Sequence, residues 1–178
     1  MPRQIALLRG INVGKHRRVG MGPLRELLTE LGYGDVQTHL QSGNILLDSK
    51  RTGARLERDL AQQIEEGLGV DPLVVVRTRD ELAAVIANDP LGDVADDPKL
   101  YQVTFLSKQP DAERVDAIEA LDVAPERVVV HEREIYAWHP TGVQRSKLAA
   151  ALTDKKLGVT ATARNWNTMK KLLELADG

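Results

Sequence analysis

Apolar residues in the first half of the chain follow two different spacings, which predict strands and helices in a definite order. The runs at residues 5–8 and 73–76 are continuous and apolar, as in buried strands. Residues 21–31 and 56–68 place an apolar side chain every three or four positions, which predicts two helices. Between these helices, residues 36–48 predict a β-hairpin. The predicted order is therefore β-α-β-β-α-β.

The same order of elements repeats after a segment rich in aspartate. Thr78 and Glu81 form a capping box, which opens a helix that ends before Pro90. Residues 89–98 then contain four Asp and two Pro, a composition typical of a linker. The elements predicted beyond it are a strand (101–105), a helix (112–121), a hairpin (128–138), a short helix (148–152), a strand (159–163) and a closing helix (166–176).

Each half has the element order of the ferredoxin-like split βαβ unit, an antiparallel sheet with helices on one face. The sequence therefore predicts an α+β fold with two ferredoxin-like halves and an extra C-terminal helix. We expect the first half at residues 1–89, an acidic linker at 90–98, and the second half with the closing helix at 99–178. No residue-level repeat links the halves, so the predicted duplication rests on element order alone.

The composition excludes several kinds of chemistry. The 178 residues, 42% apolar and 28% charged, are typical of a folded globular protein. Cysteine is absent, which excludes disulfides, cysteine-ligated metals and thiol catalysis. The four histidines have no metal-ligand spacing, so we predict no metal site, and nothing indicates a cofactor. No apolar run approaches the length of a membrane span or of a signal-peptide core, so we expect a cytoplasmic protein.

Positive charge gathers in two blocks, although the net charge of the chain is −2. Residues 1–25 contain six Lys or Arg and no acid, and residues 145–171 contain seven against the single acid Asp154. A local field attracts an anion even where the total charge is near zero. Since screening limits such fields to about 8–10 Å at physiological salt, we expect the two blocks to lie together as one positive surface.

A glycine-rich basic loop, Arg9-Gly-Ile-Asn12-Val-Gly-Lys15, follows the first predicted strand and precedes a helix. Glycines let backbone N–H groups approach an anion, and a helix N-terminus adds positive potential. Three residues rather than four separate the glycines, and histidine follows the lysine, so the loop is not a P-loop. The candidate anion contacts are Arg9, Asn12 and Lys15, and the alternative is a solvated basic loop.

Gln41-Ser-Gly-Asn44 has the composition of a hairpin turn, because Gly and Asn tolerate positive φ. This structural interpretation is the simpler one. The functional alternative is that Gln41, Ser42 and Asn44 present hydrogen-bond donors to a ligand.

Two further motifs lie in the second basic block. Ser146 precedes a short predicted helix, which favours an N-cap over a nucleophile and leaves Lys147 as the candidate anion contact. Arg164 and Asn165 precede the last helix, where Asn165 is a predicted N-cap and Arg164 a candidate charge contact. Trp166 could stack on a ligand, but its helical spacing favours the core.

Four ordered motifs of this chain resemble those of one bacterial family, the domain-of-unknown-function family numbered 1697. They are Ala6-Leu-Leu-Arg-Gly-Ile-Asn-Val-Gly14, Gln41-Ser-Gly-Asn44, Ser146-Lys-Leu148 and Arg164-Asn-Trp-Asn-Thr168. The resemblance runs from about residue 4 to the C-terminus and implies two ferredoxin-like halves. It implies no activity, because the family is named for lacking one. The chain departs from the family at Lys15, where the loop commonly has a second glycine.

Three functions stay open at this level. The first is a binding module for a phosphorylated or nucleotide-like ligand, held in a basic groove between the halves by the candidate residues of both blocks. The second is an enzyme acting on a small anionic substrate there, oriented by Ser42, Asn44 and Asn165. The third is a protein-interaction module. Nucleic acid is left open but not favoured, because the pI is near 6.1 and the first half lacks the aromatic residues of an RNA-binding sheet.

Overall fold

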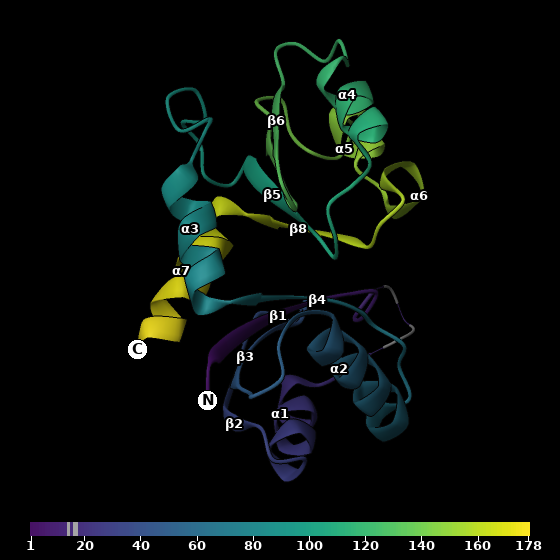
Figure 1. Ribbon diagram of the computed structural model, residues 1–178, viewed down its shortest axis with the longest axis vertical. Helices are drawn as coiled ribbons and strands as arrows, with labels where there is room; N and C mark the ends of the chain where they lie inside the picture. Colours follow the sequence, from purple (N-terminus) through teal and green to yellow (C-terminus); the bar gives the residue numbers. More distant parts are fainter. Residues whose placement is uncertain (14, 16–17) are drawn as a thin grey trace. The chain divides into compact units, whose positions relative to one another are not determined.

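The computed structural model describes residues 1–13, 15 and 18–178 and divides into two compact units. The first unit comprises residues 1–83 and 172–178, and the second comprises residues 84–171. Each unit contains one four-stranded sheet, and Figure 1 labels the elements in chain order.

The first unit has the predicted ferredoxin-like topology. Its strands run in the order β2-β3-β1-β4, and every neighbouring pair is antiparallel. The order of elements expected from the apolar spacing is confirmed. The elements are β1 (Arg3–Arg9), α1 (Met21–Glu30), β2 (Gly34–His39), β3 (Asn44–Asp48), α2 (Gly53–Leu68), β4 (Leu73–Thr78) and the beginning of α3 (Arg79–Asn88).

The second unit repeats this topology, with the sheet order β6-β7-β5-β8 and antiparallel pairs throughout. The one short helix predicted near 148–152 is in fact two, because Thr153 caps a second helix with its side chain. The elements are β5 (Tyr101–Leu106), α4 (Ala112–Glu119), β6 (Arg127–His131), β7 (Glu134–Trp138), α5 (Lys147–Ala151), α6 (Asp154–Leu157), β8 (Ala161–Asn165) and α7 (Trp166–Asp177).

The hairpin of β6 and β7 forms although its turn lacks glycine and asparagine. His131 pairs with Glu134, which leaves Glu132 and Arg133 as the turn. Glu132 takes a positive φ of 54°, the left-handed conformation that turns of this length require. Cross-strand pairing therefore imposes a backbone conformation that the turn residues themselves do not favour.

The two compact units do not end where the composition of the chain changes. Residues 84–89 belong to the second unit and residues 172–178 to the first. The composition instead predicted a first half at residues 1–89 and a second half at residues 99–178. The reason is that α3 and α7 each begin in one unit and end in the other. The aspartate-rich segment is also not a free linker: Tyr101 donates its hydroxyl to Asp89 at 3.0 Å and accepts the N–H of Leu91 at 3.3 Å.

The core of the first unit explains why β1 is a continuous apolar run. Ala6 and Leu8 face a cluster formed with the apolar residues of α1 and α2. The alternate residues Ile5 and Leu7 are only 1% and 2% exposed, so the other face of the strand is covered as well. A strand buried on both faces favours apolar residues at every position, and Gln4 is the one fully buried polar residue of β1.

In the second unit, one face of the sheet packs against its helices and the other against aromatic residues. Ile135 and Leu106 belong to the cluster on the helical face. Tyr101 stacks on Trp166, with ring centroids 4.4 Å apart and an interplanar angle of 6°. Tyr136 donates its hydroxyl to the carbonyl oxygen of Val85 at 2.7 Å. Trp166 therefore belongs to the core, as its helical spacing predicted.

Helix caps were predicted correctly because they depend on neighbouring residues. Glu81 accepts the N–H of Thr78 at 2.8 Å, and Thr78 Oγ1 accepts the N–H of Glu81 at 3.1 Å, which completes the capping box. Asn165 caps α7 by accepting the N–H of Thr168 at 2.9 Å.

The buried amide of Gln4 generates a stability prediction. Its side chain is 0% exposed, and neither side-chain polar atom has a partner among the described residues. Since an unpaired buried polar group costs about 1–3 kcal/mol, we expect Gln4→Met to raise the free energy of unfolding by about 1 kcal/mol in urea titration. Gln4→Ala should lower it, because it leaves a cavity. A loss of stability in Gln4→Met would show that the amide has a partner such as an ordered water.

Candidate functional site

The glycine-rich loop and the turn before β3 are joined by one side-chain amide. Asn12 donates through Nδ2 to the carbonyl oxygens of Val19 at 3.0 Å and Gln41 at 2.7 Å. Its Oδ1 accepts the N–H of Val19 at 2.8 Å. The amide therefore closes the loop on itself and ties it to the turn, so two segments that the sequence singled out separately meet at one end of the sheet.

Gly43 allows this close approach. Its φ is +91°, and an added Cβ would lie 2.8 Å from both Ile11 Cδ1 and Leu8 Cβ. Its carbonyl oxygen also accepts the N–H of Leu8 at 2.8 Å. Asn44 is fully buried and donates to the His39 carbonyl oxygen at 2.7 Å, so its side chain holds the turn. The hairpin interpretation of this motif is confirmed.

We refer to the described residues of 9–20, together with residues 40–43, as the loop cluster. The candidate side chains of Lys15, Gln41 and Ser42 are exposed there, and Arg9 is half-buried at the end of β1. Gly14, His16 and Arg17, which belong to the predicted loop, lie outside the described residues.

The loop cluster is positive and partly apolar. Helix α1 follows it with Gly20 as N-cap, no side-chain cap hydrogen bond and no acid in its first turn. Such a helix start carries a positive partial charge. Val13 and Leu40 are 61% and 54% exposed, which is high for large apolar side chains. The cluster therefore contains both cationic and exposed apolar side chains.

Two residues of the loop cluster that are not glycine have left-handed backbone. Asn12 has a φ of 53° and Leu40 a φ of 64°. Asparagine tolerates this region, whereas for leucine the left-handed conformation costs about 1–2 kcal/mol of conformational free energy. Because Leu40 is also exposed, its side chain gains little burial in return.

The candidates of the second unit have different surroundings from one another. Lys147 is exposed at the start of α5. Arg164 is only 9% exposed and donates to Thr162 Oγ1 at 2.8 Å and to the Ala163 carbonyl oxygen at 2.9 Å. Burial lowers the pKa of its guanidinium to about 10. Asn165 uses its side-chain oxygen to cap α7. Lys147 is thus the second-unit candidate whose charge faces solvent.

Sequence reasoning missed a buried polar cluster formed by Glu126, His139 and Ser146. Glu126 Oε2 lies 2.5 Å from His139 Nδ1 and accepts the Ser146 hydroxyl at 2.5 Å. Ser146 Oγ lies 3.1 Å from the same His139 Nδ1 and accepts the N–H of Ala149 at 2.9 Å. The N-cap prediction for Ser146 is confirmed. The cluster could not be predicted from the spacing of residues in the sequence, because its three members come from separate segments.

This cluster does not have the geometry of a hydrolytic triad. In such a triad the nucleophile and the carboxylate contact opposite nitrogens of the imidazole. Here Ser146 and Glu126 both contact Nδ1, and the Ser146 hydroxyl donates its hydrogen bond to the carboxylate rather than to the imidazole. The arrangement instead stabilises the start of α5.

Glu126 stays ionised in this setting. Burial raises the pKa of its carboxyl, but hydrogen bonds from Ser146, His139 and the backbone of Leu148 outweigh that effect and hold the pKa below its ordinary value of 4.5. The carboxylate is the common acceptor of the whole cluster.

Neutralising Glu126 should therefore lower stability in a pH-dependent way. Because its pKa is lower in the folded protein, Glu126 stabilises the fold above pH 4.5, and this contribution is lost as the pH falls through the folded value. We expect Glu126→Gln to reduce the free energy of unfolding by about 1–3 kcal/mol at pH 7, and the difference to narrow below pH 4.5. Urea titrations across pH, with the exposed Glu119→Gln as control, test this. Equal loss at every pH would show that packing, not charge, is responsible.

Other kinds of site find no support in the described part of the chain. Its His, Asp and Glu residues form no group of three or more that could hold a metal ion. None of its helices is long and apolar enough to cross a membrane.

Comparison with known proteins shows a family and a fold. No curated protein matches the chain. Among solved structures, the conserved bacterial protein SP0830 from Streptococcus pneumoniae is similar, with a TM-score of 0.80 and 24% identity over 100% of this chain and 99% of that one. The sequence model of one family matches residues 1–136, which include the loop and turn motifs but not those at 146–148 and 164–168. The chain therefore belongs to the family described as "Protein of unknown function (DUF1697)".

Proposed function

We propose that this protein is a binding module for a phosphorylated or nucleotide-like anion and that the loop cluster of the first unit holds the ligand. The observation that carries this proposal is the Asn12 amide, which ties the basic loop to the turn at Gln41. The basic side chains of Arg9 and Lys15 and the exposed amide of Gln41 thereby belong to one end of one sheet. Preorganisation of this kind reduces the entropy lost on binding.

The chemistry of the loop cluster suits a ligand that has both an anionic group and an apolar or aromatic ring. Cationic side chains and a helix start without acids attract phosphate, and the dipole of α1 adds to the attraction. The exposed side chains of Val13 and Leu40 offer contact to an apolar or aromatic group. A nucleotide combines the two features, so nucleotides are the first ligands to test.

A nucleic acid bound on the sheet surface is less favoured. Recognition of that kind requires aromatic side chains exposed on the central strands. In the second unit these side chains are buried: Tyr101, Phe105, Tyr136 and Trp138 are at most 7% exposed. We also propose a cytoplasmic location, since no apolar run in the sequence approaches the length of a membrane span.

A thermal-shift screen of inorganic phosphate, mononucleotides and short oligonucleotides tests the proposal. A ligand at a hundred times its dissociation constant adds about 2.7 kcal/mol of stability. We expect a mononucleotide to give the larger shift, and Arg9→Ala and Lys15→Ala each to weaken its binding about three- to tenfold. Arg58→Ala removes an exposed charge elsewhere on the first unit and should leave binding unchanged.

The outcomes separate the hypotheses. A ligand that returns chemically converted would favour an enzyme, and the absence of any anion-dependent shift would favour a protein-interaction module. The sequence-based hypothesis also gives Lys147 and Arg164 a part in binding. Lys147→Ala should then weaken binding as Arg9→Ala does, whereas an unchanged affinity would confine the ligand to the loop cluster.

Leu40→Gly should raise stability and lower affinity together. Glycine adopts a φ of 64° without the steric cost that leucine pays, so we expect a gain of up to about 1 kcal/mol in the free energy of unfolding. If Leu40 contacts the ligand, affinity for the mononucleotide should fall at the same time. Urea titration and the binding assay on one preparation measure both effects. A stabilised variant with unchanged affinity would remove Leu40 from the site.

A further inference from the structure

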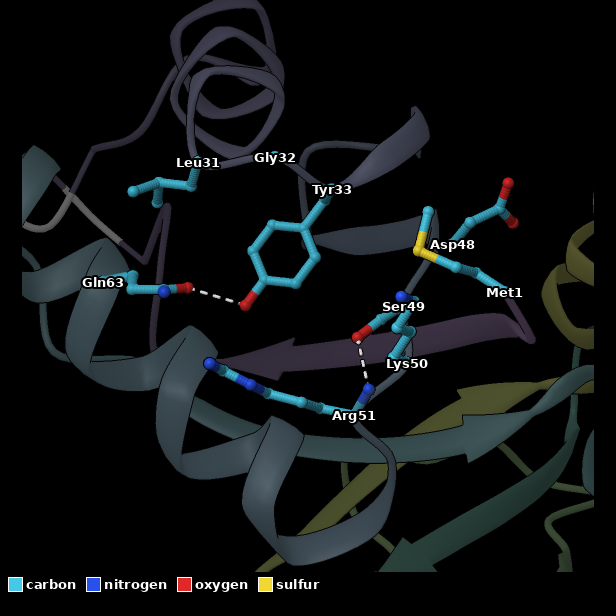
Figure 2. Close-up of a pocket in the computed structure, with 9 residues that line it drawn as sticks. All are labelled: Met1, Leu31, Gly32, Tyr33, Asp48, Ser49, Lys50, Arg51 and Gln63. Atoms are coloured by element: carbon cyan, nitrogen blue, oxygen red, sulfur yellow. Dashed lines mark hydrogen bonds between the residues drawn. The ribbon is translucent and has the colours of Figure 1, made fainter.

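A cavity of the first unit lies at the opposite end of β3 from the loop cluster. Strand β3 begins at Asn44, next to the turn, and ends at Asp48, on the rim of this cavity. The cavity has a volume of about 260 Å³. It is formed by the segment after α1, the end of β3 and the residues before α2 (Figure 2). None of the residues that line it belongs to the loop cluster.

The Tyr33 ring forms the centre of the cavity. Tyr33 is half-buried, and Figure 2 shows its ring with Leu31 to one side and Met1 to the other. The Tyr33 hydroxyl donates to Gln63 Oε1 at 2.8 Å, which fixes the ring in place. A half-buried aromatic ring held in this way is a surface on which another flat ring can stack.

Ser49 is a buried polar group with an unused donor in the same cavity. Its residue is only 5% exposed, and its Oγ accepts the N–H of Arg51 at 3.0 Å. Among the described residues, no acceptor is recorded for the proton of this hydroxyl. A buried donor without an acceptor is costly, and an anion in the cavity would satisfy it.

Lys50 is the cation at this cavity that is open to an anion. Arg51 is paired with Asp59 at 2.6 Å, and Arg3 is shared between Asp48 and Asp35, each at 3.3 Å. Lys50 is exposed and forms no ion pair within the described residues. These three cations and three carboxylates balance in number, so the attraction for an anion beside the Ser49 hydroxyl rests on the Lys50 ammonium.

The Tyr33 phenol does not oppose an anion. Burial and the nearby Asp59 carboxylate raise the pKa of Tyr33, and Arg51 and Gln63 only partly offset them. The phenol is therefore neutral at physiological pH, and its ring face remains available for stacking.

We propose that this cavity binds a small aromatic carboxylate, with its ring stacked on Tyr33 and its carboxylate at Lys50 and the Ser49 hydroxyl. The cavity is slightly smaller than the range of about 300–1,000 Å³ that suits drug-sized ligands, so the ligand has a single ring. The site is independent of the anion site in the loop cluster, because the two share no residue.

Benzoate is the probe for this proposal, and cyclohexanecarboxylate and benzamide are its matched controls. The first control keeps the charge without the aromatic ring, and the second keeps the ring without the charge. In a titration followed by two-dimensional NMR, benzoate should shift the backbone amides of residues 32–33 and 49–51 and bind at least three times more tightly than either control. Equal binding of cyclohexanecarboxylate would overturn the stacking, and equal binding of benzamide would overturn the charge contact.

Variants locate the ligand. We expect Lys50→Ala to weaken benzoate binding about three- to fivefold, and Tyr33→Leu to weaken it more. Tyr33→Phe keeps the ring while removing the hydrogen bond to Gln63, so it should retain binding and shows whether a loss in Tyr33→Leu reflects the ring. Arg9→Ala should leave benzoate affinity unchanged while it weakens nucleotide binding. Unchanged affinity in both Lys50→Ala and Tyr33→Leu would overturn the proposal.

Discussion

Each sheet of this protein depends on one central strand that is paired along both edges and buried on both faces. In the first unit this is β1, which hydrogen-bonds to β3 and β4. In the second unit it is β5, between β7 and β8. Such a strand pairs its backbone groups within the sheet and favours apolar side chains, with Gln4 in β1 and Thr104 in β5 as buried polar exceptions.

In the first unit, the charged residues of the central strand, Arg3 and Arg9, lie at its two ends. At one end of β1, Arg3 pairs with Asp48 beside the Tyr33 cavity. At the other end, Arg9 leads into the loop that Asn12 ties to the turn. The two proposed ligand sites of the first unit thus lie at opposite ends of one sheet, and the rigid strands between them hold each in place.

The two units use the same topology with different local stabilisation. The first unit covers its sheet with two long amphipathic helices, α1 and α2, whose apolar faces form a large core. In the second unit α5 and α6 are short, with five and four residues, and bury less apolar surface. Helices of that length are not stable on their own. The carboxylate of Glu126 and the caps from Ser146 and Thr153 supply the missing stabilisation.

Two features of the loop cluster lower the stability of the fold and occur at the proposed ligand site. Leucine at a left-handed position and exposed apolar side chains are both unfavourable for folding alone. Both occur at the place where Asn12 joins the basic loop to the turn. Residues that depart from local conformational preferences usually lie at functional sites.

The order of elements, the ferredoxin-like topology and the helix caps at Thr78, Ser146 and Asn165 could be predicted from the sequence alone. These features depend on spacing within about four residues, so the information lies in neighbouring positions. The division into units could not be predicted in the same way, because its boundaries fall within the helices α3 and α7 and not at a change of composition.

Tertiary structure alone decided which polar residues are used by the fold and which remain available to a ligand. Arg164 and Asn44 read as candidate contacts in the sequence, but the sheets around them bury both. Asn12 finds its partner 29 residues away, and Glu126 finds His139 and Ser146 at separations of 13 and 20 residues. The Tyr33 cavity is likewise lined by residues from four separate segments of the chain. The sequence determines which chemical groups the side chains carry. Their burial and their hydrogen-bond partners depend on distances between residues far apart in the chain, which only the tertiary structure determines.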